Sequence, residues 1–427
     1  MPEPSASHLG CFAMKVLLVE PAFPVPKKSR NHKNFLPIGL LKIYNYQRSI
    51  GNRAKLVRGK KSKREIGSRF TPERILITSL FTYWSEYVWD TVSHYRQNYP
   101  DADIVIGGIY ASLMGGSPHF RDRLKRYRAR VFMGVDPDVE EYVSENLLDY
   151  SVLGEDNGVT CQIVHSTRGC SRRCRFCGTW KIEPKFESKD SVRKELNRRK
   201  VVFYDNNLLA NPHIGKILDE LSIMKKTGEI DTCESQSGFD GRMLNPELAA
   251  AIRRAGFVNP KIAWDGPYDD WPKIESQITL LRKVGYNSKE ISVFVLYNWR
   301  IPFEEVEKKR LKCWTWKVQI SDCRFRPLTQ LHDRFDSKKS QTERDYYIHD
   351  NWTDEGIKQF RRKVRRQNIC VRHSFPFYSR ELERKLVSRK QSLRFRKMPR
   401  DAARKILPDI WYPDESEPYR PTDGRTG

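Results

Sequence analysis

Short apolar runs alternate with amphipathic stretches over the first third of the chain. Each run is bounded by Pro or Gly, which is typical of a strand buried on both faces, and each stretch between them has helical spacing. We expect strands at residues 14–21, 75–80, 102–108 and 129–134, helices at 35–51 and 85–100, and a basic surface loop at 58–69. This alternation predicts an α/β, doubly wound Rossmann-like domain over residues 14–150. Ligands of such a sheet bind at the carboxyl ends of its strands, so the segments expected to line the crevice are 21–26, 79–84 and 107–113.

A second series of strands and helices repeats about every thirty residues over 155–335. Its strands are expected at 161–166, 200–205, 230–235, 260–265, 290–297 and 316–321, with helices such as 211–228 and 245–256 between them. Six such units are fewer than the eight of a closed barrel. We therefore expect an open, partial (β/α)6 barrel of the TIM type, with its reactive face at the carboxyl ends of the strands.

The pattern changes after about residue 335 to basic amphipathic helices, expected at 352–367 and 379–397. This predicts a small, mainly helical C-terminal region over 340–412. Residues 1–13 and 413–427 are expected to be disordered, because the latter are rich in Pro, Asp, Glu and Gly and terminal segments are often unpacked.

Composition and charge narrow the classes of protein that the chain can belong to. The chain has 427 residues, and no uninterrupted apolar run is long enough to cross a membrane. Its 78 Lys and Arg against 53 Asp and Glu give a formal charge of +25, which favours an anionic partner such as RNA, although a solvated basic surface explains it equally well. No export signal is visible, so we expect a cytoplasmic protein with no membrane partner.

Three of the nine cysteines fall within eight residues, directly after the first strand of the second region. They are Cys170, Cys174 and Cys177, spaced C-x3-C-x2-C. Thiolates at such spacings are the usual ligands of iron–sulfur clusters, and three ligands on a four-iron cube leave one iron open to a small molecule. A zinc site would need a fourth ligand such as His165 or a distant cysteine, and a disulfide would leave one thiol unpaired. The spacing favours the iron–sulfur cluster.

The motif C-x3-C-x-aromatic-C, which this chain meets with Cys170, Cys174, Phe176 and Cys177, resembles that of the radical SAM superfamily. The resemblance implies that the three cysteines hold a [4Fe–4S] cluster whose open iron binds S-adenosylmethionine (SAM) through its amino and carboxylate groups. One electron then cleaves SAM to a 5′-deoxyadenosyl radical, which abstracts a hydrogen atom from the substrate. The resemblance also implies an electron donor such as flavodoxin or ferredoxin.

The resemblance places SAM-binding side chains at the ends of the first four strands of the barrel. The candidates are Phe176, Asp205, Asn206, Asn207, Ser235, Gln236, Ser237 and Asp265. Phe176 is expected near the adenine, and the group at 205–207 takes the place of the Gly-Gly-Glu that many members use for the amino group of SAM. The residues at 235–237 are candidates for the SAM carboxylate or ribose. Asp, Asn and Ser are also common in helix caps and turns, so each polar candidate has a structural alternative.

An open α/β domain before such a barrel resembles the cobalamin-binding radical SAM proteins. The resemblance rests on residues 15–24, 37–43, 77–84 and 104–112. It implies that Ser79, Thr82, Gly107 and Gly108 approach the corrin or its nucleotide tail. The Asp-x-His-x-x-Gly signature that supplies a cobalt ligand is absent, and His32 lies in the first loop without that spacing. Cobalamin bound without a protein ligand and a domain that has lost the cofactor both remain open.

Together these features predict a radical SAM enzyme, and with cobalamin they predict methylation of an unactivated carbon. Two alternatives stay open, which are a cobalamin-free radical SAM enzyme and a protein that modifies or binds RNA through its basic surface.

Overall fold

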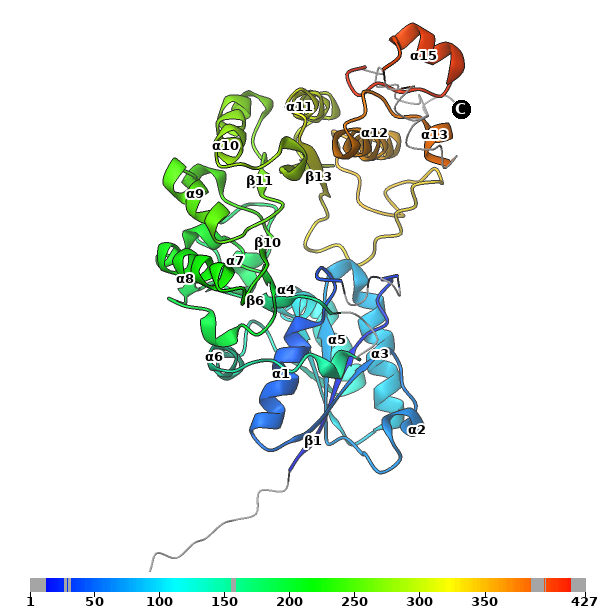
Figure 1. Cartoon of the computed structure of the whole chain (residues 1–427). Helices are drawn as coiled ribbons and strands as arrows, with labels where there is room; N and C mark the ends of the chain where they lie inside the picture. The colour runs from blue at the N-terminus through cyan, green and yellow to red at the C-terminus, as the bar shows by residue number, and fades with distance from the viewer. Residues whose placement is uncertain are drawn as a thin grey trace, which may run out of the picture.

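The computed structural model describes residues 13–26, 29, 32–154, 159–384, 395 and 397–415 (Figure 1). The N-terminal domain is built on a five-stranded parallel sheet in the order β2-β1-β3-β4-β5. Its strands are β1 (Lys15–Glu20), β2 (Arg53–Arg58), β3 (Arg74–Ser79), β4 (Asp103–Gly108) and β5 (Ala129–Val131). This order is one of the common doubly wound arrangements, in which β1 and β3 flank the point where the strand order reverses.

The apolar runs of the sequence form the buried centre of this sheet. Residues 16–19 of β1 are fully buried, with alternate side chains on opposite faces of the sheet. Val16 and Leu18 pack against α1 (Ile38–Ser49), while Leu17 and Val19 face the core shared with α3 (Ser85–Asn98). This domain also contains α4 (Ile109–Met114), α5 (Pro118–Tyr127) and α6 (Pro137–Glu145).

The sequence pattern predicted no element at strand β2 and a surface loop where helix α2 (Lys63–Ile66) lies. β2 is an edge strand in which no residue is fully buried and three of the six are Arg or Lys, so it has no apolar run. Helix α2 is a single turn that begins at a capping box, in which Ser62 and Glu65 each accept a hydrogen bond from the other's backbone N–H.

The second region contains six parallel strands, in the places that the sequence predicted. They form two three-stranded sheets, β10-β9-β6 and β11-β12-β13, with an isolated bridge between Phe239 and Ile262 at their junction. The strands are β6 (Gln162–Val164), β9 (Lys200–Phe203), β10 (Thr232–Ser235), β11 (Lys261–Ala263), β12 (Ser292–Tyr297) and β13 (Gln319–Arg324). Strand β13 begins three residues later than predicted, because the preceding helix runs to Thr315.

Helices cover the outer side of these six strands (Figure 1). They are α8 (Ile214–Lys226), α9 (Pro246–Arg254), α10 (Trp271–Lys283) and α11 (Phe303–Thr315). A short antiparallel ribbon of β7 (Thr167–Arg168) and β8 (Glu187–Ser188) and the single turn α7 (Thr179–Ile182) follow β6. None of the helices in the described part of the chain has the length and apolarity needed to cross a membrane.

The C-terminal region packs on β13 and α11 through the long helix α12 (Asp354–His373), which extends beyond the predicted 352–367. Helices α13 (Arg380–Arg384) and α15 (Arg400–Ile406) follow, and most of the predicted helix at 379–397 lies outside the described residues. The terminal segments 1–12 and 416–427 also lie outside them, whereas the buried Pro413 accepts a hydrogen bond from Arg310 at 2.8 Å.

An extended segment, residues 325–350, joins β13 to α12 and reaches the N-terminal domain on its way (Figure 1, yellow). The Ser85 hydroxyl donates to the carbonyl of Leu331 at 2.8 Å, and the guanidinium of Arg326 lies over the ring of Tyr83. This segment therefore connects the C-terminal region to the N-terminal domain.

We predict that Gly108→Ala lowers the free energy of unfolding by at least about 2 kcal/mol, because Gly108 has a φ of +95° and a Cβ there would overlap the carbonyl oxygen of Ser79. Gly116→Ala is the matched control, since a Cβ at Gly116 meets nothing within 4 Å. Urea denaturation of both variants measures the effect, and equal stabilities would contradict the tight approach of β3 and β4.

Candidate active site at the cysteine loop

The three clustered cysteines lie on one loop between β7 and α7, and all three are half-buried free thiols. Backbone N–H groups point at two of the sulfurs, from Arg172 to Cys170 at 3.4 Å and from Thr179 to Cys177 at 3.5 Å. The N–H of Cys177 donates to the carbonyl of Cys174 at 3.0 Å. Such N–H donors stabilise thiolates, which are the form that binds metal.

Burial and neighbouring charged groups shift the pKa of the Cys174 thiol. Burial raises the pKa of the Cys174 thiol, Arg172 opposes this rise, and the neighbouring Cys177, Asp265 and Cys170 add to it. Within the described ranges, no three His, Cys, Asp or Glu side chains are arranged to hold a single metal ion. An iron–sulfur cube is bound at three separate corners rather than at one point, so it needs three thiols on one loop but not three ligands around a single ion.

A buried carboxylate fixes the start of this loop. Asp205, which is fully buried at the end of β9, accepts hydrogen bonds from the backbone N–H and the hydroxyl of both Ser166 and Thr167, at 2.6 to 3.2 Å. Burial raises the pKa of Asp205, and these four donors oppose the rise. We expected Asp205 to contact SAM. Its carboxylate accepts four hydrogen bonds from the segment before the cysteines and so positions that segment, and a contact with SAM stays a prediction.

Gly169 lets the segment before Cys170 pass close to the backbone of Lys185. It has a φ of +73° and lies directly against the carbonyl of Lys185, where no Cβ would fit. Its N–H donates to Glu183 at 2.6 Å, and Glu183 also pairs with Arg168 at 2.7 Å. The chain thus closes on itself just before Cys170.

The other two residues of the 205–207 group have different partners, and their predicted contact with the amino group of SAM stays a prediction. The exposed Asn206 accepts a hydrogen bond from the hydroxyl of Thr179 at 3.1 Å. Asn207 is buried and donates to Asp240 at 3.2 Å, while its Oδ1 is buried with no hydrogen-bond partner among the described residues. An unpartnered buried acceptor at this strand end suits a donor on a ligand, such as an ammonium group.

The three candidates after β10 have different surroundings. The hydroxyl of Ser235 donates to the carbonyl of Gly238 at 2.7 Å and so closes a local turn, and Ser237 is exposed. Gln236 donates to Asn34 at 2.9 Å, and its Oε1 is buried without a partner in the described part of the chain. Of Ser235, Gln236 and Ser237, Gln236 is therefore the one with a buried polar atom that is still without a partner in the described part of the chain.

Asp265 and Phe176 complete the strand ends. Asp265 has no hydrogen-bond or ion-pair partner among the described residues, and burial raises the pKa of its carboxyl. The buried Lys309 donates to the carbonyls of Trp264, at 3.3 Å, and of Gly266, and thereby holds the two residues that flank Asp265. Burial lowers the pKa of Lys309 to about 8.

The ring of Phe176 meets that of Trp299 edge to face, with centroids 6.4 Å apart. Trp299 lies just beyond the end of β12, on the same reactive face, and the sequence reasoning did not assign it to the site. Its position after a strand was the signal that could have found it.

Comparison with known proteins decides what this region is. Residues 164–293 match the family model of the Radical SAM superfamily. The second region is a radical SAM domain.

Two solved structures of the radical S-adenosylmethionine methyltransferase TsrM from Kitasatospora setae resemble most of the chain. The structure with cobalamin and a [4Fe–4S] cluster bound is 12% identical, with a TM-score of 0.57, and the likeness covers 74% of this chain and 77% of that chain. The structure with tryptophan substrate and the SAM analogue aza-SAM is 14% identical, with a TM-score of 0.53 and 74% of each chain covered. At these identities the likeness shows a shared fold. No curated protein matches the sequence.

The loop after β1 joins the N-terminal domain to the radical SAM domain. Lys33 pairs with Glu234 of β10, whose other carboxylate oxygen accepts a hydrogen bond from Lys261 at 2.7 Å. The carbonyl of Lys33 accepts the hydroxyl of Tyr204, and Asn34 accepts the hydrogen bond from Gln236. The carboxyl edges of the two sheets therefore face one another.

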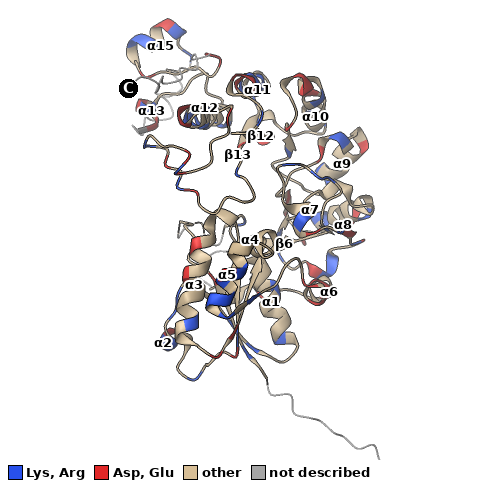
Figure 2. Cartoon of the chain, turned by 180° about the vertical axis from the view of Figure 1, so that it is seen from behind, with Lys and Arg blue, Asp and Glu red and all other residues tan. Residues whose placement is uncertain are grey.

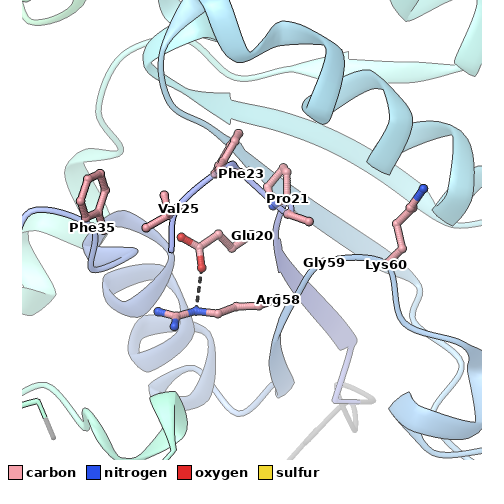
Figure 3. Close-up of a pocket in the computed structure, with 9 residues that line it drawn as sticks. Glu20, Pro21, Phe23, Val25, Phe35, Arg58, Gly59 and Lys60 are labelled. Atoms are coloured by element: carbon pink, nitrogen blue, oxygen red, sulfur yellow. Dashed lines mark ion pairs between the residues drawn. The ribbon is translucent and has the colours of Figure 1, made fainter. Parts of the chain in front are cut away.

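A cavity of about 310 Å³ lies at the carboxyl ends of β1 and β2 (Figure 3). It is lined by Glu20, Pro21, Ala22, Phe23, Val25, Phe35, Arg58, Gly59 and Lys60. Arg58 and Glu20 form an ion pair at 2.6 Å along one side of it. The predicted crevice segment 21–26 thus lines a cavity, together with residues of β2 that the sequence pattern did not mark.

The four residues expected to approach a corrin do not line this cavity. The Ser79 hydroxyl donates to the carbonyl of Gly107 at 2.7 Å and accepts the N–H of Ala111 at 3.0 Å, and Gly108 lies against the carbonyl of Ser79. Thr82 is buried at the start of the short turn Thr82–Trp84. In the structure, Ser79, Gly107 and Gly108 link β3, β4 and α4, and their approach to a corrin stays a prediction.

A buried ionic group on α1 makes a further contact between the domains. Lys42 donates to both carboxylate oxygens of Glu140, at 2.8 and 2.9 Å, and lies 3.5 Å from Nδ1 of His165 at the end of β6. Burial, followed by the charges of Lys42, Arg168 and Lys189, holds the pKa of His165 well below its ordinary value. His165 is therefore neutral in the folded protein, with Nδ1 free to accept from Lys42.

We predict that protonation of His165 in the unfolded chain destabilises the fold in acid. Above about pH 6.5 the histidine is neutral in both states, and below it only the unfolded chain takes up the proton, so the free energy of unfolding falls by up to about 1.4 kcal/mol per pH unit. His165→Asn should remove this part of the slope between pH 7.5 and 5.5, and His119→Asn, at an exposed position, should not. Equal slopes for the wild type and His165→Asn in urea titrations would show that His165 does not carry the effect.

Proposed function

We propose that this chain is a radical SAM enzyme in which Cys170, Cys174 and Cys177 hold a [4Fe–4S] cluster and SAM binds beside them. The observation that carries the proposal is a loop of three free thiols next to strand ends that present two buried acceptors with no partner in the described chain, on Asn207 and Gln236. The match of residues 164–293 to the Radical SAM superfamily supports it. When bound and supplied with one electron, the cluster and SAM provide a radical that removes a hydrogen atom from a carbon of the substrate.

The chain's own residues bind and orient these groups. Asn207 Oδ1 is suited to accept from the amino group of SAM, and Asp240 holds its amide in place. Phe176 and Trp299 offer an aromatic face for the adenine. Asp265, with both carboxylate oxygens open, can accept from a hydroxyl or an amine of the bound molecules, and Lys309 fixes the backbone on either side of it.

We further propose that the N-terminal domain binds cobalamin and that the reaction transfers a methyl group to an unactivated carbon. The domain has a cavity at the carboxyl edge of its sheet, and this edge faces the radical SAM domain through Lys33 and Asn34. The cavity combines charged and apolar lining, from the Arg58–Glu20 ion pair, Lys60 and Phe23, which suits a macrocycle with polar amide arms. The fold likeness to a TsrM structure with cobalamin bound supports this assignment.

No histidine of the described first loop is arranged as a cobalt ligand. His32 is exposed, and its Nδ1 accepts the N–H of Asn34 at 3.3 Å. The proposal is therefore cobalamin held without a protein ligand. Stacked aromatic pairs, Phe23 with Trp84 and Phe81 with Tyr83, would keep water from the methyl group that the cofactor supplies.

We predict that anaerobic reconstitution loads about four irons and four sulfides per chain, and that Cys174→Ala binds much less because one corner of the cluster loses its ligand. Cys323→Ala is the matched control, since Cys323 is also a half-buried free thiol but lies on β13. Iron and sulfide assays, together with the formation of 5′-deoxyadenosine from SAM under dithionite, measure the outcome. Full iron content in Cys174→Ala would remove the cluster assignment.

The cobalamin part has a separate test. Protein reconstituted with hydroxocobalamin should retain about one corrin per chain by extraction and mass spectrometry. Val25→Trp, which fills the cavity, should lower corrin retention at least about tenfold and leave the iron content unchanged, because Val25 lines the cavity away from the cysteines. Ile50→Trp, at a residue that is 53% exposed on the far end of α1, is the control. Wild-type protein with a full cluster and no corrin would make the chain a cobalamin-free radical SAM enzyme.

A further inference from the structure

Exposed cations without acidic partners surround the outer side of the cysteine loop. We call this the loop surface and define it by Arg173, Arg175, Lys181 and Lys185 together with the apolar Phe186 and Met133. None of its four cations pairs with a carboxylate in the described part of the chain, and Lys181 lies over the ring of Trp180. Residues 170–187 hold five Lys or Arg and only two Glu. The surface is therefore strongly positive, and Lys and Arg positions gather around α7 in Figure 2.

The acidic residues nearby do not neutralise this charge. Glu183 is already engaged by Arg168 and the N–H of Gly169, and Glu187 is a single exposed carboxylate on β8. The loop surface therefore keeps a net positive charge next to the three cysteines.

Two exposed apolar side chains adjoin the cations. Phe186 is 36% exposed and sits beside the cysteine loop, because β8 pairs with β7 and the carbonyl of Lys185 touches Gly169. Met133 is 55% exposed, and the next residue, Gly134, lies against the carbonyl of Ile182 in α7. Apolar side chains within a charged rim are the usual composition of a protein–protein interface.

We propose that the loop surface is the docking site for an acidic one-electron carrier protein of the ferredoxin class. This inference rests on the proposed function, because a cluster held by the cysteines must be reduced from outside. Half-buried cysteines place that cluster directly beneath the loop surface. One electron leaves the reduced iron–sulfur centre of the carrier and enters the cluster of this chain, and no proton or covalent bond moves with it.

The position of the surface favours a carrier protein over a nucleic acid. A single-stranded nucleic acid needs a positively charged track with aromatic rings along it, whereas the loop surface is a compact patch around one loop. The exposed cations of α5, Arg121, Lys125 and Arg126, lie on another domain and provide a matched comparison.

The test uses the whole chain and a plant-type [2Fe–2S] ferredoxin, kept reduced by NADPH and its reductase. Lys181→Glu/Lys185→Glu should lower the ferredoxin-driven rate of 5′-deoxyadenosine formation at least about tenfold at low salt, since two charges reverse and the net charge of the docking site falls by about four units. The control Arg121→Glu/Lys125→Glu changes the charge equally on α5 and should retain the wild-type rate. Dithionite-driven rates should stay at the wild-type level in both variants. Biolayer interferometry on the protein before iron loading gives a second readout, in which only the loop-surface variant loses ferredoxin binding.

The outcomes separate the docking site from the proposed function. Absence of dithionite-driven cleavage in the wild type would overturn the function, while interferometry would still decide the docking site. Equal ferredoxin rates and binding in the wild type and the loop-surface variant would overturn the docking site, and so would an equal loss in the α5 control. If the loop-surface variant lost binding to a uridine 20-mer but still bound ferredoxin, the loop surface would be a nucleic-acid site, and this result would also overturn the proposal.

Discussion

The site depends on one buried carboxylate. Asp205 ties the end of β9 to Ser166 and Thr167, which lead into the cysteine loop, by four hydrogen bonds. A buried carboxylate is costly unless it is paired or fully hydrogen-bonded, and here four donors from two consecutive residues meet that requirement. The two segments are thereby fixed to each other, so the position of the thiols relative to the strand ends is set before any cofactor binds. The close contact of Gly169 with Lys185 narrows the remaining freedom of the loop.

From this fixed loop the rest of the arrangement extends outward. The strand ends of the radical SAM domain present Asn207, Gln236 and Asp265 with unused acceptor atoms, while Lys33 and Asn34 bring the edge of the N-terminal sheet against the same strands. The segment 325–350 reaches back to Ser85 and Tyr83 and ties the C-terminal region to that edge. Two sheets with facing carboxyl ends suit the proposed reaction, in which SAM and cobalamin must both approach the substrate.

The sequence predicted the centre of the fold well and its edges less well. Buried strands such as β1 and β4 were visible because both of their faces are apolar, whereas the edge strand β2 has no apolar run and was missed. The cysteine motif identified the loop because its spacing is chemically specific. Polar residues at strand ends were harder, since Asp205 and Ser235 serve the backbone while Asn207 and Gln236 keep free atoms, and only the three-dimensional contacts distinguish them. Ser79 is a similar case: it lies in a predicted crevice segment, but its hydroxyl is hydrogen-bonded to the backbone of Gly107 and Ala111, which the sequence alone does not reveal.

The central claim is that the three cysteines leave one iron of a cluster open to SAM. Pulsed electron–nuclear double resonance of the dithionite-reduced protein, mixed with SAM labelled with ¹⁵N at the amino group and ¹⁷O at the carboxylate, tests it most directly. The account predicts hyperfine coupling of both labels to the cluster signal. A full cluster signal that shows no coupling to either label would contradict it.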